Sequence, residues 1–195
     1  MKTAKNILVI TYWSLNDALI QSYTLPYLRI IRNILPEGSC IHLVTFEPNN
    51  ITTGKYFLEK NILQHAFRQM PFGLKALIAR IKTNHDLLKL IHKENIDTIH
   101  AWCTTAGAMG WRLSKQTGLP LIIDSYEPHA EAMTENGTWK KNGIAYRLLL
   151  YLEKKQTFHA KHLICAAPGM PEYARKTYGY TGTNFFIKPA CVDPV

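Results

Sequence analysis

Titratable and polar side chains gather directly after an apolar run near the middle of the sequence. Residues 120–123 are apolar, and the chemistry-bearing residues that follow are Asp124, Tyr126, Glu127, His129 and Glu131. Carboxylates and an imidazole are the groups that transfer protons and stabilise developing charge in enzymes. We therefore interpret Glu127 and His129 as candidate catalytic residues, and Asp124, Tyr126 and Glu131 as candidate substrate-binding residues. The structural alternative is that Asp124 caps a turn, Pro128 ends the strand and the other groups belong to a solvated loop.

Apolar runs alternate with helical periodicity along the whole chain. The runs have the length and composition of strands covered on both faces, and they lie at residues 6–12, 40–46, 98–101, 120–124 and 162–166. Helices are expected at residues 20–33, 72–94, 106–117, 142–158 and 171–178. The segment 51–70 is ambiguous, with a short helix followed by a strand at 62–67 as the arrangement considered. The alternation predicts a doubly wound, mostly parallel α/β sheet with helices on both faces, as in Rossmann-like domains.

Ligands of such sheets bind outside the carboxyl ends of the strands, so polar and aromatic residues after the other strands join the candidate site. Trp13 and Asp17 follow the first predicted strand, and Trp102 and Thr104 follow the third. An indole offers an apolar face against which a sugar ring packs, so we predict that these four residues bind substrate. The alternative is that the two tryptophans only cover the core.

The composition narrows the classes of protein and partner. The chain has 195 residues, 47% of them hydrophobic, which is enough to fill the core of one domain. Its formal net charge of +9 suggests an acidic partner, which is a nucleic acid, an anionic membrane surface or a phosphorylated substrate. No RRM, KH or helix-turn-helix pattern is present, so we expect no nucleic acid. A basic nucleic-acid-binding module stays an alternative because of the charge, as does an α/β ligand-binding domain without catalysis.

Several kinds of cofactor and location are disfavoured. No G-x-G-x-x-G follows the first strand, and the four cysteines are far apart, so small buried thiols are expected. His159 and His162 have ligand-like spacing but no third ligand nearby in sequence, so no metal is expected. No apolar run approaches the roughly 18 to 20 residues of a membrane span, and no signal segment precedes the first strand. These features predict a cytoplasmic protein.

Five segments match, in order and spacing, the motifs of one family. They are NIDTIHAW at 95–102, GLPLIIDSYE at 118–127, HLICAAPGM at 162–170, YARKTYG at 173–179 and IKPACVD at 187–193. Together they resemble the N-terminal domain of a GT-B glycosyltransferase of the large retaining family (glycosyltransferase family 4-like). By position the resemblance extends to Asp124 and Glu127. Tyr126 stands where the family has a histidine, with His129 three residues further on, and the family's glycine-rich turn after the first strand is replaced by bulky residues.

The resemblance implies a domain organisation and an activity. Residues 1–187 would form a Rossmann-like acceptor-side domain, and 188–195 would begin the linker to a C-terminal domain that binds most of the nucleotide-sugar donor. The chain itself would then need no cofactor and would be inactive alone, as half of a hexosyltransferase-type enzyme. The implied partners are that C-terminal domain and a sugar or lipid-linked acceptor, in cell-surface polysaccharide or glycolipid synthesis.

A run of cations suggests a further partner. Lys140, Arg147, Lys154 and Lys161 recur at seven-residue steps, close to two helical turns, and so predict one basic stripe on a helix. The apolar residues of this helix, Ile144, Ala145, Leu148, Leu149 and Leu152, are expected to face the sheet. The stripe would hold the protein peripherally at the inner face of an anionic membrane. The alternative is an ordinary solvated helix face.

Overall fold

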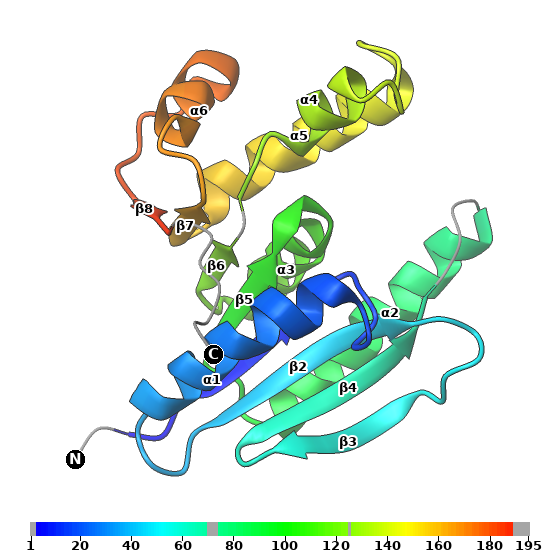
Figure 1. Ribbon diagram of the computed structural model, residues 1–195, viewed down its shortest axis with the longest axis vertical. Helices are drawn as coiled ribbons and strands as arrows, with labels where there is room; N and C mark the ends of the chain where they lie inside the picture. Colours follow the sequence, from blue (N-terminus) through cyan, green and yellow to red (C-terminus); the bar gives the residue numbers. More distant parts are fainter. Residues whose placement is uncertain (1–2, 70–73, 125, 189–195) are drawn as a thin grey trace.

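The computed structural model describes residues 3–69, 74–124 and 126–188, with the backbone alone for 74–78. Eight strands form one sheet: β1 (Asn6–Ile10), β2 (Cys40–Glu47), β3 (Gly54–Glu59), β4 (Ile62–Arg68), β5 (Thr98–Trp102), β6 (Leu121–Asp124), β7 (His162–Cys165) and β8 (Phe185–Ile187). Their order across the sheet is β3-β4-β2-β1-β5-β6-β7-β8 (Figure 1). All neighbouring strands are parallel except β3, which pairs with β4 in the antiparallel direction.

Helices connect the strands on both faces of the sheet. They are a π-helical turn η1 (Ile20–Thr24), α1 (Leu25–Ile34), α2 (Leu74–Lys93), α3 (Cys103–Thr117), α4 (His129–Glu135), α5 (Ile144–His159) and α6 (Met170–Tyr178). The predicted doubly wound, mostly parallel α/β sheet is confirmed. None of the helices in the described part of the chain is long and apolar enough to cross a membrane.

Alternating side chains of the central strands feed two separate cores. In β1, Val9 packs with Leu25 and Leu28 of α1, whereas its neighbours Leu8 and Ile10 pack into the core that α2 and α3 cover on the opposite face. Strands buried on both faces need apolar residues at every position, which is why these strands appear in the sequence as unbroken apolar runs. Because both faces of the sheet are covered, polar functional groups can reach a ligand only at the ends of the strands.

Three expectations about elements need correction. The segment before β4 forms strand β3 and not a helix, and β8 and α4 were not expected. On α2, the side chain of Ile81 is 60% exposed, while Leu87, Leu90 and Ile91 are buried. The predicted linker beyond Lys188 lies outside the described residues, as does Cys191; among the described residues Cys103 and Cys165 are buried, and Cys40 is half-buried.

Helix α5 is oriented differently from the expectation. Ile144 and Leu148 were expected to face the sheet, but Ile144 is 90% exposed and Leu148 is 58% exposed. The buried residues of α5 are Tyr146, Glu153, Gln156 and Thr157. The apolar pattern gave the wrong face because Glu153, Gln156 and Thr157 form hydrogen bonds inside the protein, so these polar side chains can be buried.

Candidate functional site

The parallel strands end together at one edge of the sheet, here called the carboxyl edge. Trp102 is the last residue of β5 and Asp124 the last of β6, and these strands are neighbours with Trp102 paired to Asp124. Glu47 ends β2 on the far side of β1. The carboxyl edge therefore carries two buried carboxylates and a buried indole.

Asp124 is held by two cationic or polar partners. Its side chain is buried and accepts a hydrogen bond of 2.7 Å from Lys188 Nζ, and the His100 Nε2 atom lies 3.3 Å from the same oxygen. Burial alone would raise the pKa of the Asp124 carboxyl, but the His100 hydrogen bond and the Lys188 charge outweigh it and lower the pKa. Asp124 is therefore a charged, paired group, suited to fixing Lys188 in place.

Lys188 also lies among three aromatic rings. Its Nζ atom is 3.8 Å from the ring centroid of Tyr27, 4.6 Å from that of Trp102 and 5.0 Å from that of Tyr23. Aromatic faces attract an ammonium group, most strongly where water is excluded. This lysine cage, made by Tyr23, Tyr27 and Trp102 with Asp124, anchors the end of β8 at the carboxyl edge.

Glu127 lies on the loop that follows β6, and His129 is the first residue of α4. The Oε1 atom of Glu127 is 3.2 Å from Nδ1 of His129, and the Glu127 side chain is 55% exposed against 25% for His129. The hydrogen bond that His129 donates to Glu127 raises the pKa of His129. A carboxylate that holds Nδ1 leaves Nε2 as the atom able to exchange a proton with a ligand, and Nε2 has no hydrogen bond to a described residue.

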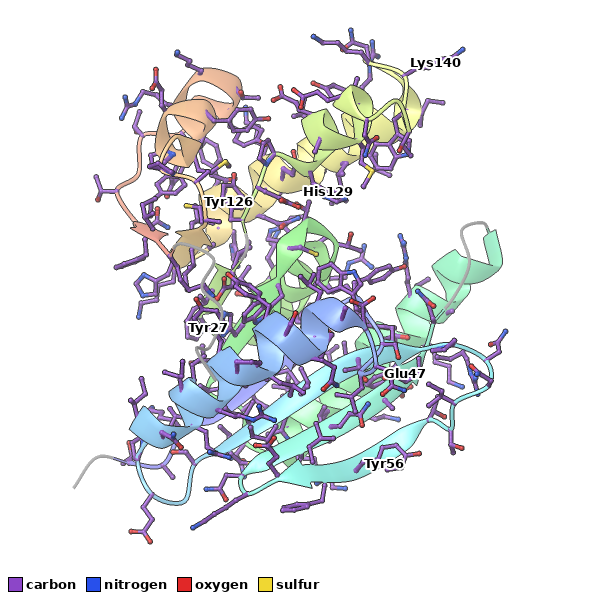
Figure 2. All side chains as sticks on the ribbon, viewed as in Figure 1. Tyr27, Glu47, Tyr56, Tyr126, His129 and Lys140 are labelled. Atoms are coloured by element: carbon purple, nitrogen blue, oxygen red, sulfur yellow. The ribbon has the colours of Figure 1, made fainter. Side chains whose placement is uncertain are left out.

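Glu153 of α5 fixes the helix that begins at His129. Its carboxylate is fully buried and accepts hydrogen bonds of 2.9 Å from the backbone N–H of Ala130 and from the Tyr178 hydroxyl. Burial raises the pKa of Glu153 to about 7. Because Ala130 is the second residue of α4, Glu153 positions the first turn of α4, and with it His129 (Figure 2).

The other predicted substrate-binding residues of this region are mainly in the interior. Tyr126 is buried and its hydroxyl contacts the Thr157 hydroxyl, and burial raises the Tyr126 pKa. Thr104 is buried, and its hydroxyl has no hydrogen-bond partner among the described residues. Glu131 lies in the first turn of α4 and is half-buried.

The remaining two predicted residues lie on the loop after β1 and make mainly local contacts. Trp13 is half-buried against the core that α1 covers, where its carbonyl accepts a hydrogen bond from the Phe46 N–H. Asp17 accepts a hydrogen bond from the Leu19 N–H at 2.9 Å and supports the start of η1. These contacts are structural, and no contact joins Trp13 or Asp17 to Glu127 or His129 in the described part of the chain.

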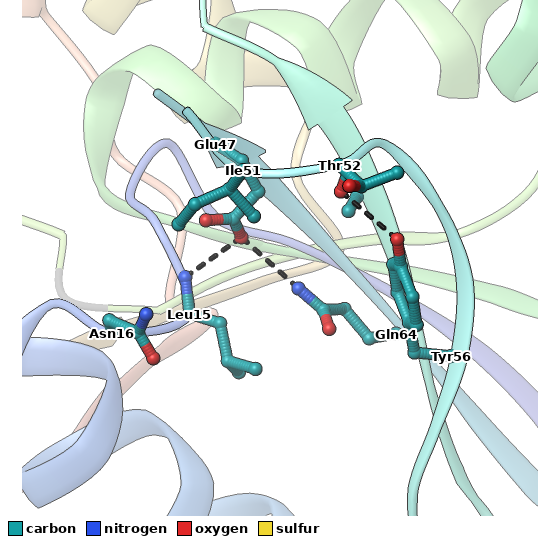
Figure 3. Close-up of a pocket in the computed structure, with 8 residues that line it drawn as sticks. Leu15, Asn16, Glu47, Ile51, Thr52, Tyr56 and Gln64 are labelled. Atoms are coloured by element: carbon teal, nitrogen blue, oxygen red, sulfur yellow. Dashed lines mark hydrogen bonds between the residues drawn. The ribbon is translucent and has the colours of Figure 1, made fainter. Parts of the chain in front are cut away.

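A hollow opens beside Glu47. It has a volume of about 290 Å³ and is lined by Leu15, Asn16, Glu47, Ile51, Thr52, Tyr56, Gln64 and Ala66 (Figure 3). Glu47 is buried and accepts hydrogen bonds from the Ser14 hydroxyl, from the Leu15 N–H at 2.9 Å and from Gln64 Nε2 at 3.1 Å. These bonds tie the loop after β1 to β2 and β4.

Sequence reasoning missed several residues that organise the carboxyl edge: His100, Lys188, Tyr23, Tyr27, Glu47 and Glu153. One of them had a signal, since Glu153 is the only acid between Trp139 and His162. A lone acid in a basic helix indicates a buried partner inside the protein. Of the predicted basic stripe, Arg147 and Lys154 lie on α5, Lys140 precedes it and Lys161 follows it, and all four are exposed. No three metal-ligating side chains gather among the described residues.

The chain resembles known proteins in fold but not in sequence. No protein-family model and no curated protein sequence matches the chain. Its fold is similar to that of sucrose-phosphate synthase from Thermosynechococcus elongatus, with a TM-score of 0.68 at 13% identity over 95% of this chain and 48% of that one. UGT2 from Phytolacca americana, complexed with UDP-2-fluoro-glucose and pterostilbene, has a TM-score of 0.61 at 11% identity over 100% of this chain and 56% of that one.

A glycosyltransferase from Rickettsia africae has a TM-score of 0.53 at 12% identity, over 96% of this chain and 43% of that one. The chain has the fold of one half of a GT-B glycosyltransferase. It spans about half the length of each of these three proteins. The carboxyl edge is where open α/β sheets bind ligands. It carries Glu127, His129, Asp124 and the lysine cage.

Proposed function

We propose that this chain is the acceptor-binding half of a nucleotide-sugar-dependent glycosyltransferase of the hexosyltransferase type, acting in cell-surface polysaccharide or glycolipid synthesis. The observation that carries the proposal is the Glu127–His129 pair at the carboxyl edge of a GT-B half. The coverage of about half of each related chain supports a separate C-terminal half as the partner that binds most of the donor. The proposed acceptor is a sugar or a lipid-linked sugar. The proposed reaction needs the nucleotide-sugar donor and no further cofactor.

The geometry of the pair suggests how it would act. Glu127 accepts a hydrogen bond from Nδ1–H of His129, so in the neutral imidazole Nε2 is the nitrogen that can accept a proton. Nε2 would take the proton of an acceptor hydroxyl as its oxygen bonds to the anomeric carbon of the donor, while the bond to the nucleoside diphosphate breaks. Glu127 stabilises the imidazolium that forms, consistent with the raised pKa of His129.

The test uses a protein in which this chain is joined to its donor-binding half. We expect His129→Ala and Glu127→Ala to lower kcat by about 10²-fold or more, the scale for a positioned proton-transfer group. The pH–rate profile of Glu127→Ala should shift its acidic limb to lower pH, because the pKa of His129 falls when its partner is removed.

Glu135→Ala serves as the matched control, since Glu135 is an exposed acid at the far end of the same helix. It should retain wild-type turnover. Wild-type rates for the His129 and Glu127 variants, with unchanged melting temperatures, would show that the pair is structural and that catalysis lies elsewhere.

A further inference from the structure

Helix α5 exposes apolar side chains and buries polar ones. Ile144, Leu148, Tyr151 and Phe158 are each more than half exposed, whereas Glu153, Gln156 and Thr157 have no exposed surface. A surface helix of a globular protein normally has the opposite arrangement. Exposed apolar side chains that recur along one helix indicate a contact with something outside this chain.

The exposed apolar residues share one face with cations. At 100° per residue, seven residues fall within an arc of about 120° around the helix, opposite Glu153 and Gln156. We call this the outer face of α5; its residues are Ile144, Arg147, Leu148, Tyr151, Lys154, Lys155 and Phe158. Lys155 lies 5.3 Å from the ring centroid of Tyr151, and Lys154 lies 5.8 Å from that of Phe158. Charged and apolar groups are therefore interleaved on one surface.

The outer face carries no negative charge. Glu153 is the only acid between Trp139 and His162, and it is buried on the opposite side of the helix. Beyond the ends of α5, exposed Lys140, Lys141 and Lys161 extend the positive field. A second copy of this face would bring like charges together, so the charge pattern requires an anionic partner.

We propose that the outer face of α5 docks the protein on the surface of an anionic lipid bilayer. The cations contact lipid headgroups, while Ile144, Leu148 and Phe158 enter the boundary between headgroups and acyl chains and Tyr151 lies at the headgroup level. A nucleic acid would satisfy the cations but offers no apolar layer behind its phosphates. The bilayer is the partner that matches both components of the face.

The docking would place the candidate site one helix away from the bilayer surface, because α4 packs against the side of α5 that is opposite the outer face. Helix α4 begins at His129 and is bonded to α5 through Glu153, so the outer face and His129 belong to one rigid pair of helices. Lys140, labelled at the top of Figure 2, lies within the loop 136–143 that joins these two helices. The inference deepens the proposed function, because a protein docked on a bilayer is suited to a lipid-linked acceptor. Only this preference for the acceptor rests on the proposed function. Binding to vesicles requires no sugar transfer and is tested separately.

Co-sedimentation of the purified chain with vesicles tests the inference. We expect binding to phosphatidylcholine vesicles that contain about one-third phosphatidylglycerol, no binding to pure phosphatidylcholine, and loss of binding near about 0.5 M salt. Arg147→Glu with Lys154→Glu should weaken binding by at least about 30-fold, which corresponds to losing two cations near an anionic surface. Leu148→Gln with Phe158→Gln should weaken it by about 10-fold or more through loss of apolar insertion.

Matched controls come from other exposed helix positions. Lys82→Glu with Lys89→Glu, and Ile34→Gln with Ile81→Gln, change the same kinds of exposed residue on α2 and α1. They should bind more tightly than the corresponding outer-face variants. Equal losses from control and outer-face variants would mean that only net charge or total hydrophobicity matters, and the docking surface would be wrong.

Two further outcomes would overturn the inference. One is the absence of vesicle binding at low salt. The other is competition by an oligonucleotide whose affinity is unchanged in the Leu148→Gln, Phe158→Gln variant, since this would identify a nucleic-acid surface. Vesicle binding by a protein whose His129 variant transfers sugar at the wild-type rate would uphold the docking surface and reject the proposed catalytic pair.

Discussion

At the scale of single residues, the protein places several ionisable groups in its interior and gives each a specific partner. Asp124 is matched by Lys188, and Glu153 by a backbone N–H and a tyrosine hydroxyl. His42 of β2 and His65 of β4 form a further pair, with Nδ1 of His42 3.1 Å from Nε2 of His65. Two stacked imidazoles share one hydrogen bond there, which requires at least one of them to be neutral.

The histidine pair predicts a dependence of stability on pH. Burial lowers the pKa of both rings, and it lowers that of His65 to about 4, with a further contribution from the charge of His42. An unfolded histidine has a pKa of about 6.5, so between about pH 6.5 and 4 the unfolded state binds protons that the folded state does not. The free energy of unfolding should fall by up to about 3 kcal/mol as the pH drops through this window.

Urea denaturation of wild type and His65→Phe at pH 7 and pH 5 measures the contribution of the pair, because groups outside the pair titrate alike in both proteins. The variant should lose less stability on acidification than wild type. His92→Gln, at an exposed position, should follow the wild-type profile. Identical pH dependence of His65→Phe and wild type would mean that the pair does not control acid stability.

The sequence predicts candidate-site residues where strand ends define them. Asp124 ends one predicted strand and Trp102 directly follows another, so the rule about carboxyl ends is enough to place them near each other. Lys188 could not be placed in the same way, because it reaches Asp124 across 64 residues and its cage includes two rings from the region of η1 and α1. Such contacts depend on how elements far apart in the sequence pack together, and the local sequence pattern does not determine this packing.

At the scale of elements, apolar runs located the parallel strands well because both faces of each are covered. The exposed edge strand β3 was missed since most of its residues face solvent, and β8 was missed because it has only three residues. Helix α5 was predicted as a helix but in the wrong orientation. Its interior side consists of Glu153, Gln156 and Thr157, whose partners lie on α3, α4, α6 and the β6 loop and are invisible to a count of apolar residues.

The contact between α3 and α5 predicts the effect of one methyl group. A Cβ at Gly107 would lie 2.0 Å from Oε1 of Gln156, whose Nε2 is bonded to the Thr104 carbonyl. Gly107→Ala should therefore reduce the free energy of unfolding by about 1–3 kcal/mol, since Gln156 must move and break the hydrogen bond that its Nε2 donates to the Thr104 carbonyl. Urea denaturation of the purified variant measures this loss.

A double-mutant cycle identifies the cause. Gly107→Ala combined with Gln156→Ala should be less destabilised than the sum of the two single variants, because the clash no longer exists. Gly110→Ala is the matched control: its Cβ would meet Leu121 at 2.9 Å and not Gln156, so its effect should add to that of Gln156→Ala. Additive losses for Gly107 and Gln156 would exclude their direct contact as the cause.

At the scale of the whole molecule, one continuous sheet and two cores predict that the chain folds by itself. Thermal unfolding should be a single cooperative transition, since every strand is bonded to a neighbour in the same sheet. The proposed absence of a donor-binding half predicts that transfer from a panel of nucleotide sugars stays at background. Circular dichroism and a transfer assay on the same preparation test both statements, and substantial transfer by this chain alone would reject the half-enzyme proposal.

The lysine cage has a mechanical consequence. Lys188 is fixed by a carboxylate and three rings, so any chain that continues past it starts from an immobile point at the carboxyl edge. A domain attached there would turn about a fixed point at the carboxyl edge, and its motion would leave the strands of this sheet in place.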